Sequence, residues 1–310
     1  MSGFVRFIIK RLLFTVIVLI CVSIFTFALV RIAPGNPVLS LLPMEASDEQ
    51  IAALEIKLGF DKPLPVQYIK YMSGVFRGDF GTSIYYRTSV LTLIMGKLPT
   101  TATIAFGTVL FGALISIVLG VIAGSNRGKP IDFFAVAFAL IGQSMASPWL
   151  AILFIYIFAL KLNLLPAIGT QSGIKDYILP IATNTTVMVA VVVRMARSGM
   201  INTLNEDYIT VTYAKGIRRA VVNWKYGFKN AMLPVVTILG LQLGVFLAGV
   251  VVVETIFGMS GIGNLLYEAV MSRDYPLLQS IVLICAFFIS MINLIVDIIN
   301  ASIDPRLVLE

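Results

Sequence analysis

Residues 194–234 read RMARSGMINTLNEDYITVTYAKGIRRAVVNWKYGFKNAMLP and interrupt a chain that is otherwise almost continuously apolar. The segment is rich in Arg, Lys, Asn and Tyr, and apolar runs flank it on both sides. A polar insert between two membrane spans is first of all a docking surface, although a merely solvated basic connection would look the same in isolation. The rest of the chain decides between these two interpretations.

The composition indicates an integral membrane protein. Hydrophobic residues make up 58% of the chain and charged residues 13%, with a mean hydropathy of +0.95, whereas soluble domains carry about 25% charged residues. A bilayer core of roughly 30 Å requires about 20 apolar residues per helical span. Lipid cannot form hydrogen bonds with backbone N–H and C=O groups, so a span of this length must be helical. We therefore predict an all-α fold with six transmembrane helices, with Pro148 and Pro180 leaving the ends of the third and fourth open. The six runs cover residues 7–30, 101–124, 133–160, 179–195, 233–253 and 277–300.

The distribution of basic residues predicts the orientation. If the first run is retained as a span and the N-terminus lies inside, the cytoplasmic segments hold 13 Lys and Arg against 6 Asp and Glu. The outer segments hold 10 basic and 10 acidic residues, so the whole net charge of +7 falls on one side. Because cytoplasmic loops are enriched in Lys and Arg, we expect both termini in the cytoplasm.

Several kinds of chemistry are excluded by the residues present. The chain has no histidine, which removes Ser–His catalysis and His-ligated zinc. Cys21 and Cys285 lie in the middle of apolar spans, so we assign neither a disulfide nor a metal role. The segment GSNRGKP at residues 124–130 is not a P-loop, because it has too few residues between its glycines and no Ser or Thr after Lys129. We predict no catalytic residue, no metal site and no cofactor bound by this chain.

The pattern divides the chain into three regions. Residues 1–31 form the N-terminal segment and first span, residues 32–100 an outer polar region with a short amphipathic helix at 48–58, and residues 101–310 a five-span core whose inner loop covers 197–232.

Small and polar residues within the spans predict two further features. Gly120 with Gly124, and Gly240 with Gly244, have the fourfold spacing that lets helices approach closely, and we favour packing within the chain over a dimer face. Polar groups at membrane depth usually face a bundle interior or a water-filled cavity. Those groups are candidates for lining a pathway, with plain interhelical hydrogen bonding as the open alternative; they include Gln143, Asn184 and Gln242.

Four separated segments carry motifs that run in order along almost the whole chain: RIAPGNP at 31–37; RMAR at 194–197 with Glu206, Asp207, Tyr208, Ala214, Lys215, Gly216, Asn230, Ala231 and Pro234; Glu254, Ile256, Phe257, Gly261 and Gly263 with RDYP at 273–276; and Asp304, Pro305 and Arg306. Together these segments resemble the permease of the dipeptide, oligopeptide and nickel ABC import systems. The chain departs from the family's pattern at Asn36, Thr212, Tyr213, Tyr226, Met259 and Ser260.

The resemblance implies a type I ABC importer permease fold in a bacterial cell membrane, with two sets of functional residues. The inner set would couple the chain to an ATPase and consists of Glu206, Asp207, Tyr208, Ala214, Lys215, Gly216, Asn230 and Pro234. The outer set would face a binding protein and consists of Glu254, Phe257, Gly261, Gly263 and Asp274. The implied partners are a second homologous permease, two cytoplasmic ATP-binding subunits that hold ATP and Mg, an extracytoplasmic substrate-binding protein and the bilayer, with no nucleic acid.

The inner loop suits two short helices. Glu206 and Asp207 favour the positive end of a helix dipole, and Gly216 is able to adopt the positive φ that ends such a helix. A second short helix is expected before Pro234, which fits the first turn of the fifth span. Two short helices on stalks would form a protruding knob.

These observations predict a permease subunit that forms the passage of an ATP-driven importer together with a second permease. Di- or oligopeptides are the expected cargo, and nickel or a metal chelate is the alternative. A gradient-driven secondary transporter is disfavoured because the sequence shows no inverted repeat and no acidic relay residue in mid-membrane. An intramembrane hydrolase is disfavoured because histidine and paired intramembrane carboxylates are lacking.

Overall fold

The computed structural model describes residues 2–32, 47, 49–50, 52–53, 56, 61–169, 173–249 and 251–303. Within these residues the chain is almost entirely helical, with one isolated β-bridge between Thr82 and Ser89. Most of the helix predicted at 48–58, and the motifs at 33–37 and 304–306, lie outside the described residues.

Four long helices are apolar enough to cross a membrane, judged over the described residues. They are α1 (Ser2–Ile32), α4 (Val90–Ser125), α7 (Lys175–Leu204) and α14 (Tyr275–Ile303). Helix α4 begins earlier than the predicted start at residue 101, although Pro99 lies inside it. The reason is packing, because Val90 and Ile94 are buried in a cluster with residues of α13 (Ile262–Met271) and α14.

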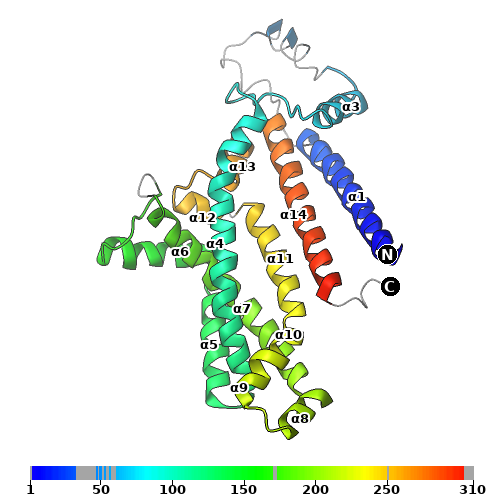
Figure 1. The fold of residues 1–310 in the computed structure, drawn as a ribbon. Coiled ribbons are helices and arrows are strands. Elements are labelled where there is room, and N and C mark those ends of the chain that lie inside the picture. Colours follow the sequence, from blue (N-terminus) through cyan, green and yellow to red (C-terminus); the bar gives the residue numbers. More distant parts are fainter. Residues whose placement is uncertain are drawn as a thin grey trace.

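Two bent pairs of helices are the other candidate spans, and counting each pair as one gives up to six, the predicted number. Helix α5 (Pro130–Ser144) is followed, after a bend of 98°, by α6 (Ser147–Phe154) and η2 (Ile155–Lys161), which turn away from the bundle in Figure 1. Pro148 lies in the first turn after this bend, whereas Pro180 lies inside α7 without ending it. The second pair joins residues 219–231 to α11 (Leu233–Leu247) with a bend of 56°.

The predicted continuation of the fifth span to residue 253 is wrong. Helix α11 ends at Leu247, and a separate short helix α12 (Val251–Ile256) follows. Gly249 lies between them with a φ of 96°, a value that favours glycine. A Cβ atom at this position would lie 2.8 Å from the backbone of Gly263, so the close approach of α13 also requires glycine.

Glycine allows α4 and α7 to pack along each other. A Cβ atom at Gly120 would lie 2.4 Å from the Ala196 Cβ, and one at Gly124 would lie 2.5 Å from the Met200 Cβ. At Gly240 on α11, a Cβ atom would lie 2.0 Å from Val296 of α14. The predicted packing within the chain is therefore confirmed for these glycines.

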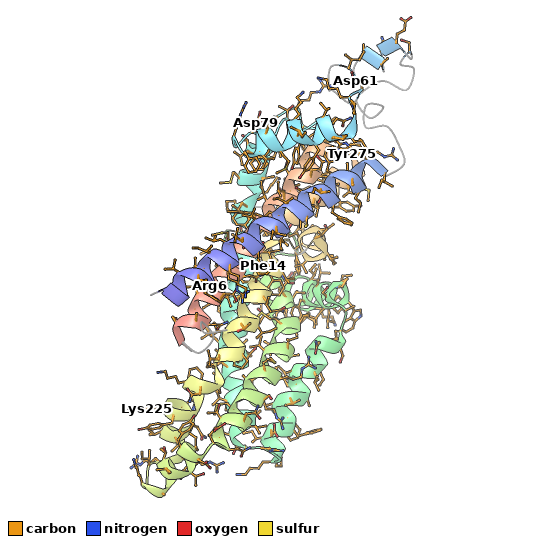
Figure 2. The ribbon with its side chains drawn as sticks, turned by 90° about the vertical axis from the view of Figure 1, so that its right-hand side faces the viewer. Arg6, Phe14, Asp61, Asp79, Lys225 and Tyr275 are labelled. Carbon is orange, nitrogen blue, oxygen red and sulfur yellow. The ribbon has the colours of Figure 1, made fainter. Side chains whose placement is uncertain are left out.

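Both ends of the bundle carry charged residues and short helices, and Figure 1 shows how these helices are arranged. At one end lie α3 (Leu64–Val75), α12 and α13; at the other, a projection formed by α8 (Asp207–Ala214), α9 (Arg219–Val221), η3 (Val222–Gly227) and α10 (Phe228–Ala231). The ends of α1 and α14 that carry the two chain termini lie side by side and point toward this projection. In Figure 2, Lys225 marks the projection, while Asp61 and Asp79 mark the opposite end.

Candidate functional site

The projection at residues 207–231, here called the knob, begins with α8. The backbone of Glu206 is extended at the N-cap position and Asp207 is in the first turn, so both acids lie at the positive end of the helix dipole. Ile209 and Thr212 are buried, and Gly216 has a φ of 72° just after the helix ends. The predicted helix and its glycine stop are confirmed.

The second half of the knob folds back on α8. The Asn230 Nδ2 donates to the Tyr208 Oη over 2.8 Å, across 22 residues of sequence. The Tyr213 hydroxyl donates to the Asn223 Oδ1 over 3.3 Å. These contacts join α8 to η3 and α10, with Val222 fully buried between them and the bundle. Of the residues predicted for the inner set, the structure thus brings Tyr208 and Asn230 together.

The tip of the knob is exposed. Ala214, Lys215 and Gly216 are all accessible, and a Cβ atom at Gly216 would meet nothing within 4 Å. Apolar side chains lie exposed nearby, among them Val211 and Trp224. The predicted second short helix is present as α9, η3 and α10, and Pro234 occupies the first turn of α11 as expected.

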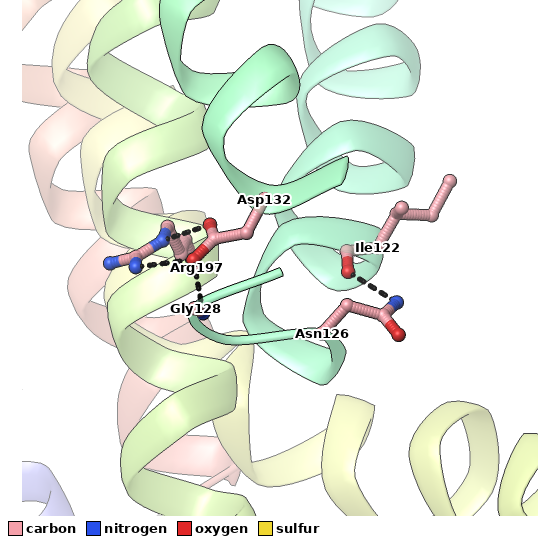
Figure 3. Close-up of polar contacts among 5 residues, drawn as sticks. All are labelled: Ile122, Asn126, Gly128, Asp132 and Arg197. Atoms are coloured by element: carbon pink, nitrogen blue, oxygen red, sulfur yellow. Dashed lines mark hydrogen bonds and ion pairs between the residues drawn. The ribbon is translucent and has the colours of Figure 1, made fainter. Parts of the chain in front are cut away.

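A partly buried ion pair holds the base of α7 against α5, close to the knob (Figure 3). The Arg197 Nε and Nη2 donate to the two carboxylate oxygens of Asp132 over 2.6 and 2.8 Å. The same carboxylate accepts the Gly128 amide over 3.0 Å, which closes the turn between α4 and α5. The sequence singled out Arg197 but not this partner; a lone acid at the start of an apolar run, among basic residues, is the signal that could have found it.

At the opposite end, the side chain of Glu254 on α12 caps the N-terminus of α13. Its carboxylate accepts the Thr101 hydroxyl over 2.7 Å and the Asn264 amide over 3.0 Å. The Thr101 Oγ1 in turn accepts the Ile262 amide over 2.8 Å. These residues of three helices, here called the outer clasp, satisfy amides that the first turn of a helix otherwise leaves unpaired.

Burial raises the pKa of the Glu254 carboxyl above its ordinary value, while the Thr101 hydroxyl and the backbone amides of Asn264 and Gly263 oppose that rise. A Cβ atom at Gly261 would lie 2.3 Å from the Glu254 carboxyl carbon. The glycine at that position is therefore required for the carboxylate to reach the helix.

Asp274 has a similar role at the start of α14. Its side chain accepts the Leu277 amide over 3.2 Å within α14, the Tyr85 amide over 3.1 Å and a short hydrogen bond from the Ser83 hydroxyl. Asp274 therefore caps α14 and fastens the segment before α4 to it. The sequence indicated neither Ser83 nor Thr101, because both lie far from their partners along the chain.

The residues predicted to face a binding protein share one property in this structure, which is burial. They are Glu254, Phe257, Gly261, Gly263 and Asp274. Their contacts are internal, and contact of this end with a binding protein stays a prediction. The exposed residues around the outer clasp, such as Ser260 and Tyr267, are the ones that a partner would reach.

The three pathway candidates lie on three different helices. Gln143 is half-buried near the end of α5, Asn184 is buried in α7 with its Nδ2 atom unpaired, and Gln242 is half-buried in α11. The buried, unpaired amide of Asn184 is the strongest sign of a polar interior. That these side chains line one passage stays a prediction.

A bundle of straight and bent candidate membrane helices with a protruding polar knob at one end is the architecture of a multi-pass membrane protein. The chain belongs to the family of binding-protein-dependent transport system inner membrane components, whose sequence profile matches residues 116–309. The N-terminal profile of the same kind of transport system matches residues 4–105. The predicted family and all-α permease fold are thus confirmed, and the protein is a multi-pass membrane protein.

Named relatives cover the whole length of the chain. A dipeptide transport system permease of Alkalihalophilus pseudofirmus is 36% identical over 96% of this chain and 98% of its own. A glutathione transport system permease of Salmonella typhimurium is 35% identical over 97% of this chain and 98% of its own. The inward-facing MetNI methionine ABC transporter has a similar fold, with a TM-score of 0.58 and 16% identity over 69% of this chain and 97% of its own.

Proposed function

We propose that this chain is a permease subunit of an ATP-driven importer of peptides, and that it forms the passage together with a second, homologous permease. In this proposal the complex contains two cytoplasmic ATPase subunits, and the knob of this chain docks onto one of them. A substrate-binding protein delivers cargo at the opposite end, which carries the outer clasp. ATP and Mg would be held by the ATPase subunits.

The exposed tip of the knob is the observation that carries this proposal. A merely solvated loop has no need of a folded core, yet Ile209 and Val222 are fully buried. The knob is instead built to a fixed shape, with exposed apolar residues beside the small residues Ala214 and Gly216. Small residues at a tip permit close contact with a groove, and exposed apolar groups favour a protein partner.

Peptide cargo is supported by the relatives, whose names refer to dipeptides, glutathione and peptides. Nickel or a metal chelate is the alternative cargo. Substrate identity is tested by purifying the partner binding protein from cells and determining its retained ligand by mass spectrometry. A peptide supports the proposal, and a metal or metal chelate overturns the peptide assignment.

Crosslinking tests the docking of the knob. In a variant whose two native cysteines are replaced, Ala214→Cys is joined with a short bifunctional reagent in membranes that contain the complete transporter. We expect a product with an ATPase subunit. The control is Arg77→Cys, an exposed position at the opposite end, which should give none. The docking assignment is overturned if Ala214→Cys never captures an ATPase.

Uptake assays separate the proposal from a gradient-driven carrier. Vesicles that contain the complete transporter should accumulate peptide when ATP is supplied and the ion gradients are collapsed. Uptake that follows the gradient, and continues without ATP, would show a secondary transporter instead.

A further inference from the structure

The knob is attached to the bundle by chain connections that are not continuous helix. Asn205 and Glu206 separate α7 from α8, and Gly216 with its φ of 72° separates α8 from α9. Between α10 and α11 the chain bends by 56° at Met232. Each break is a place where backbone dihedral angles could change, so contacts between the knob and the bundle set the angle of the knob. On α7 these contacts are close, since a Cβ atom at Gly199 would lie 2.5 Å from the Ala231 backbone oxygen.

One side-chain hydrogen bond joins the knob to a helix that is not its neighbour in the chain. The Arg219 Nη2 donates to the backbone oxygen of Ser125, the last residue of α4, over 2.7 Å. The other side-chain hydrogen bonds recorded for the knob, including those of Tyr208 and Tyr213, lie within it. Among the described residues, Arg219 is therefore the polar link between the knob and α4.

Helix α4 has a need for this arginine. Its last turn contains no basic residue, and its final carbonyl groups lack partners within the helix. Asn126 supplies two of the missing donors, to Ile122 and Ala123, and Arg219 supplies the third. A guanidinium at a helix C-terminus is also attracted by the negative end of the dipole.

A surface crevice of about 300 Å³ lies beside this bond, between the end of α4 and η3, and is lined by Val121, Ile122, Asn223 and Trp224 together with the two bonded residues. Apolar contact alone therefore leaves open space between the knob and α4. The hydrogen bond from Arg219 to Ser125 joins the knob to α4 at the edge of this crevice.

We propose that Arg219 is a positioning residue that fixes the angle of the knob against α4, so that movement of the knob tilts the bundle instead of being absorbed at the chain breaks. This inference rests on the proposed function, because it assumes that the knob receives the movement of an ATPase. It adds to that function the route by which the movement reaches a helix with no direct chain connection to the knob.

The test uses the complete transporter and three variants. Arg219→Met keeps most of the aliphatic stem and removes every donor, while Arg219→Lys restores a charged donor. Arg218→Met is the matched control, because Arg218 is adjacent to Arg219 and the structure records no side-chain hydrogen bond or ion pair for Arg218. Uptake of peptide per ATP hydrolysed is measured for each. A loss of about fivefold, at the lower end of coupling factors between linked sites, is expected for Arg219→Met alone.

A distance measurement provides the readout that a merely structural role would not change. Spin labels at Lys215→Cys in the knob and Lys129→Cys at the turn after α4 report the angle of the knob in a cysteine-replaced background. Arg219→Met should broaden the distance distribution, whereas Arg219→Lys and Arg218→Met should leave it narrow. Unchanged distances together with unchanged uptake per ATP in Arg219→Met would overturn the inference.

The two proposals fail in different ways. If Ala214→Cys crosslinks to the ATPase while Arg219→Met behaves as the unaltered chain, the docking proposal stands and the role of Arg219 is wrong. If Arg219→Met does not assemble into the transporter, Arg219→Lys provides the test. A narrow distance distribution with normal uptake per ATP in Arg219→Lys supports the role of the donor. A broad distance distribution with normal uptake per ATP refutes it.

Discussion

The close contact between α4 and α7 predicts a clear difference between two glycines that look alike in the sequence. An alanine at position 124 would place its Cβ atom 2.5 Å from the Met200 Cβ and 2.9 Å from the Arg197 backbone oxygen. Both obstacles are fixed, because one is backbone and the other belongs to a fully buried side chain. An alanine at position 244 would meet nothing closer than an Ile289 methyl at 3.5 Å, an ordinary contact.

The magnitudes follow from two opposing terms. Replacing a glycine by alanine in a helix interior, such as position 244, gains about 1 kcal/mol, and the gain is smaller at position 124, the penultimate residue of α4. Overpacking costs roughly 1–3 kcal/mol, and it applies to Gly124→Ala alone. We therefore expect Gly244→Ala to be slightly stabilising, and Gly124→Ala to be less stable than Gly244→Ala by about 2 kcal/mol.

Thermal melting in detergent measures this difference. For a chain of this size, about 2 kcal/mol corresponds to roughly 4 °C in the midpoint, provided that both variants are heated at the same rate, since unfolding of membrane proteins is often irreversible. Gly96→Ala, with nothing within 4 Å of its added methyl, is a second control. If Gly124→Ala melts at or above the temperature of Gly244→Ala, the packing described for α4 and α7 is wrong.

Three further predictions concern the polar ends. Thr101→Val removes the donor to Glu254 and the acceptor of the Ile262 amide. The loss of local stability, about 2 kcal/mol, should appear as faster hydrogen exchange over residues 261–265. Unchanged exchange there would contradict the outer clasp. Arg197→Ala leaves the Asp132 carboxylate with the Gly128 amide alone and should cost about 2 kcal/mol. The exposed Arg194→Ala should cost less than about 0.5 kcal/mol, and equal melting temperatures for the two variants would refute this. Because burial raises the pKa of Glu254, its contribution to stability is complete below the ordinary carboxyl pKa of about 4.3 and is lost as the pH rises through the raised value. The melting temperature should thus fall more between pH 4 and pH 7 for the unaltered chain than for Glu254→Gln, and parallel curves would exclude this titration.

The sequence predicted features that depend on local signals. The limits of α8 follow from Glu206, Asp207 and Gly216, which act on their own helix, and the spans follow from apolar runs that lipid requires. The bend of 98° near Pro148 was only partly predictable, because proline disfavours helix before it but does not set the new direction. Pro180 shows the limit of the rule, since it has the same local effect and α7 continues through it.

The burial of the outer residues, and their role as helix caps, could not be predicted for a different reason. Glu254 and Asp274 are charged and lie near turns, which is typical of exposed residues, yet both are almost completely buried. Their hydrogen-bond partners Thr101 and Ser83 are 153 and 191 residues away in the sequence. Only the fold shows that two helix N-termini are buried here and that each needs an acceptor.

Helix α4 links the two polar ends of the molecule. The 24 residues that separate Thr101 from Ser125 lie in one uninterrupted helix and span about 36 Å. At one end Thr101 contacts the outer clasp, and at the other Ser125 accepts the hydrogen bond of Arg219. Between them, Gly120 and Gly124 hold α4 against α7 too closely for the two helices to slide without overlap. If the knob moves as proposed, we expect α4 to carry the change of tilt as one rigid helix, and the hydrogen bonds of Thr101 to be the first in the outer clasp to change.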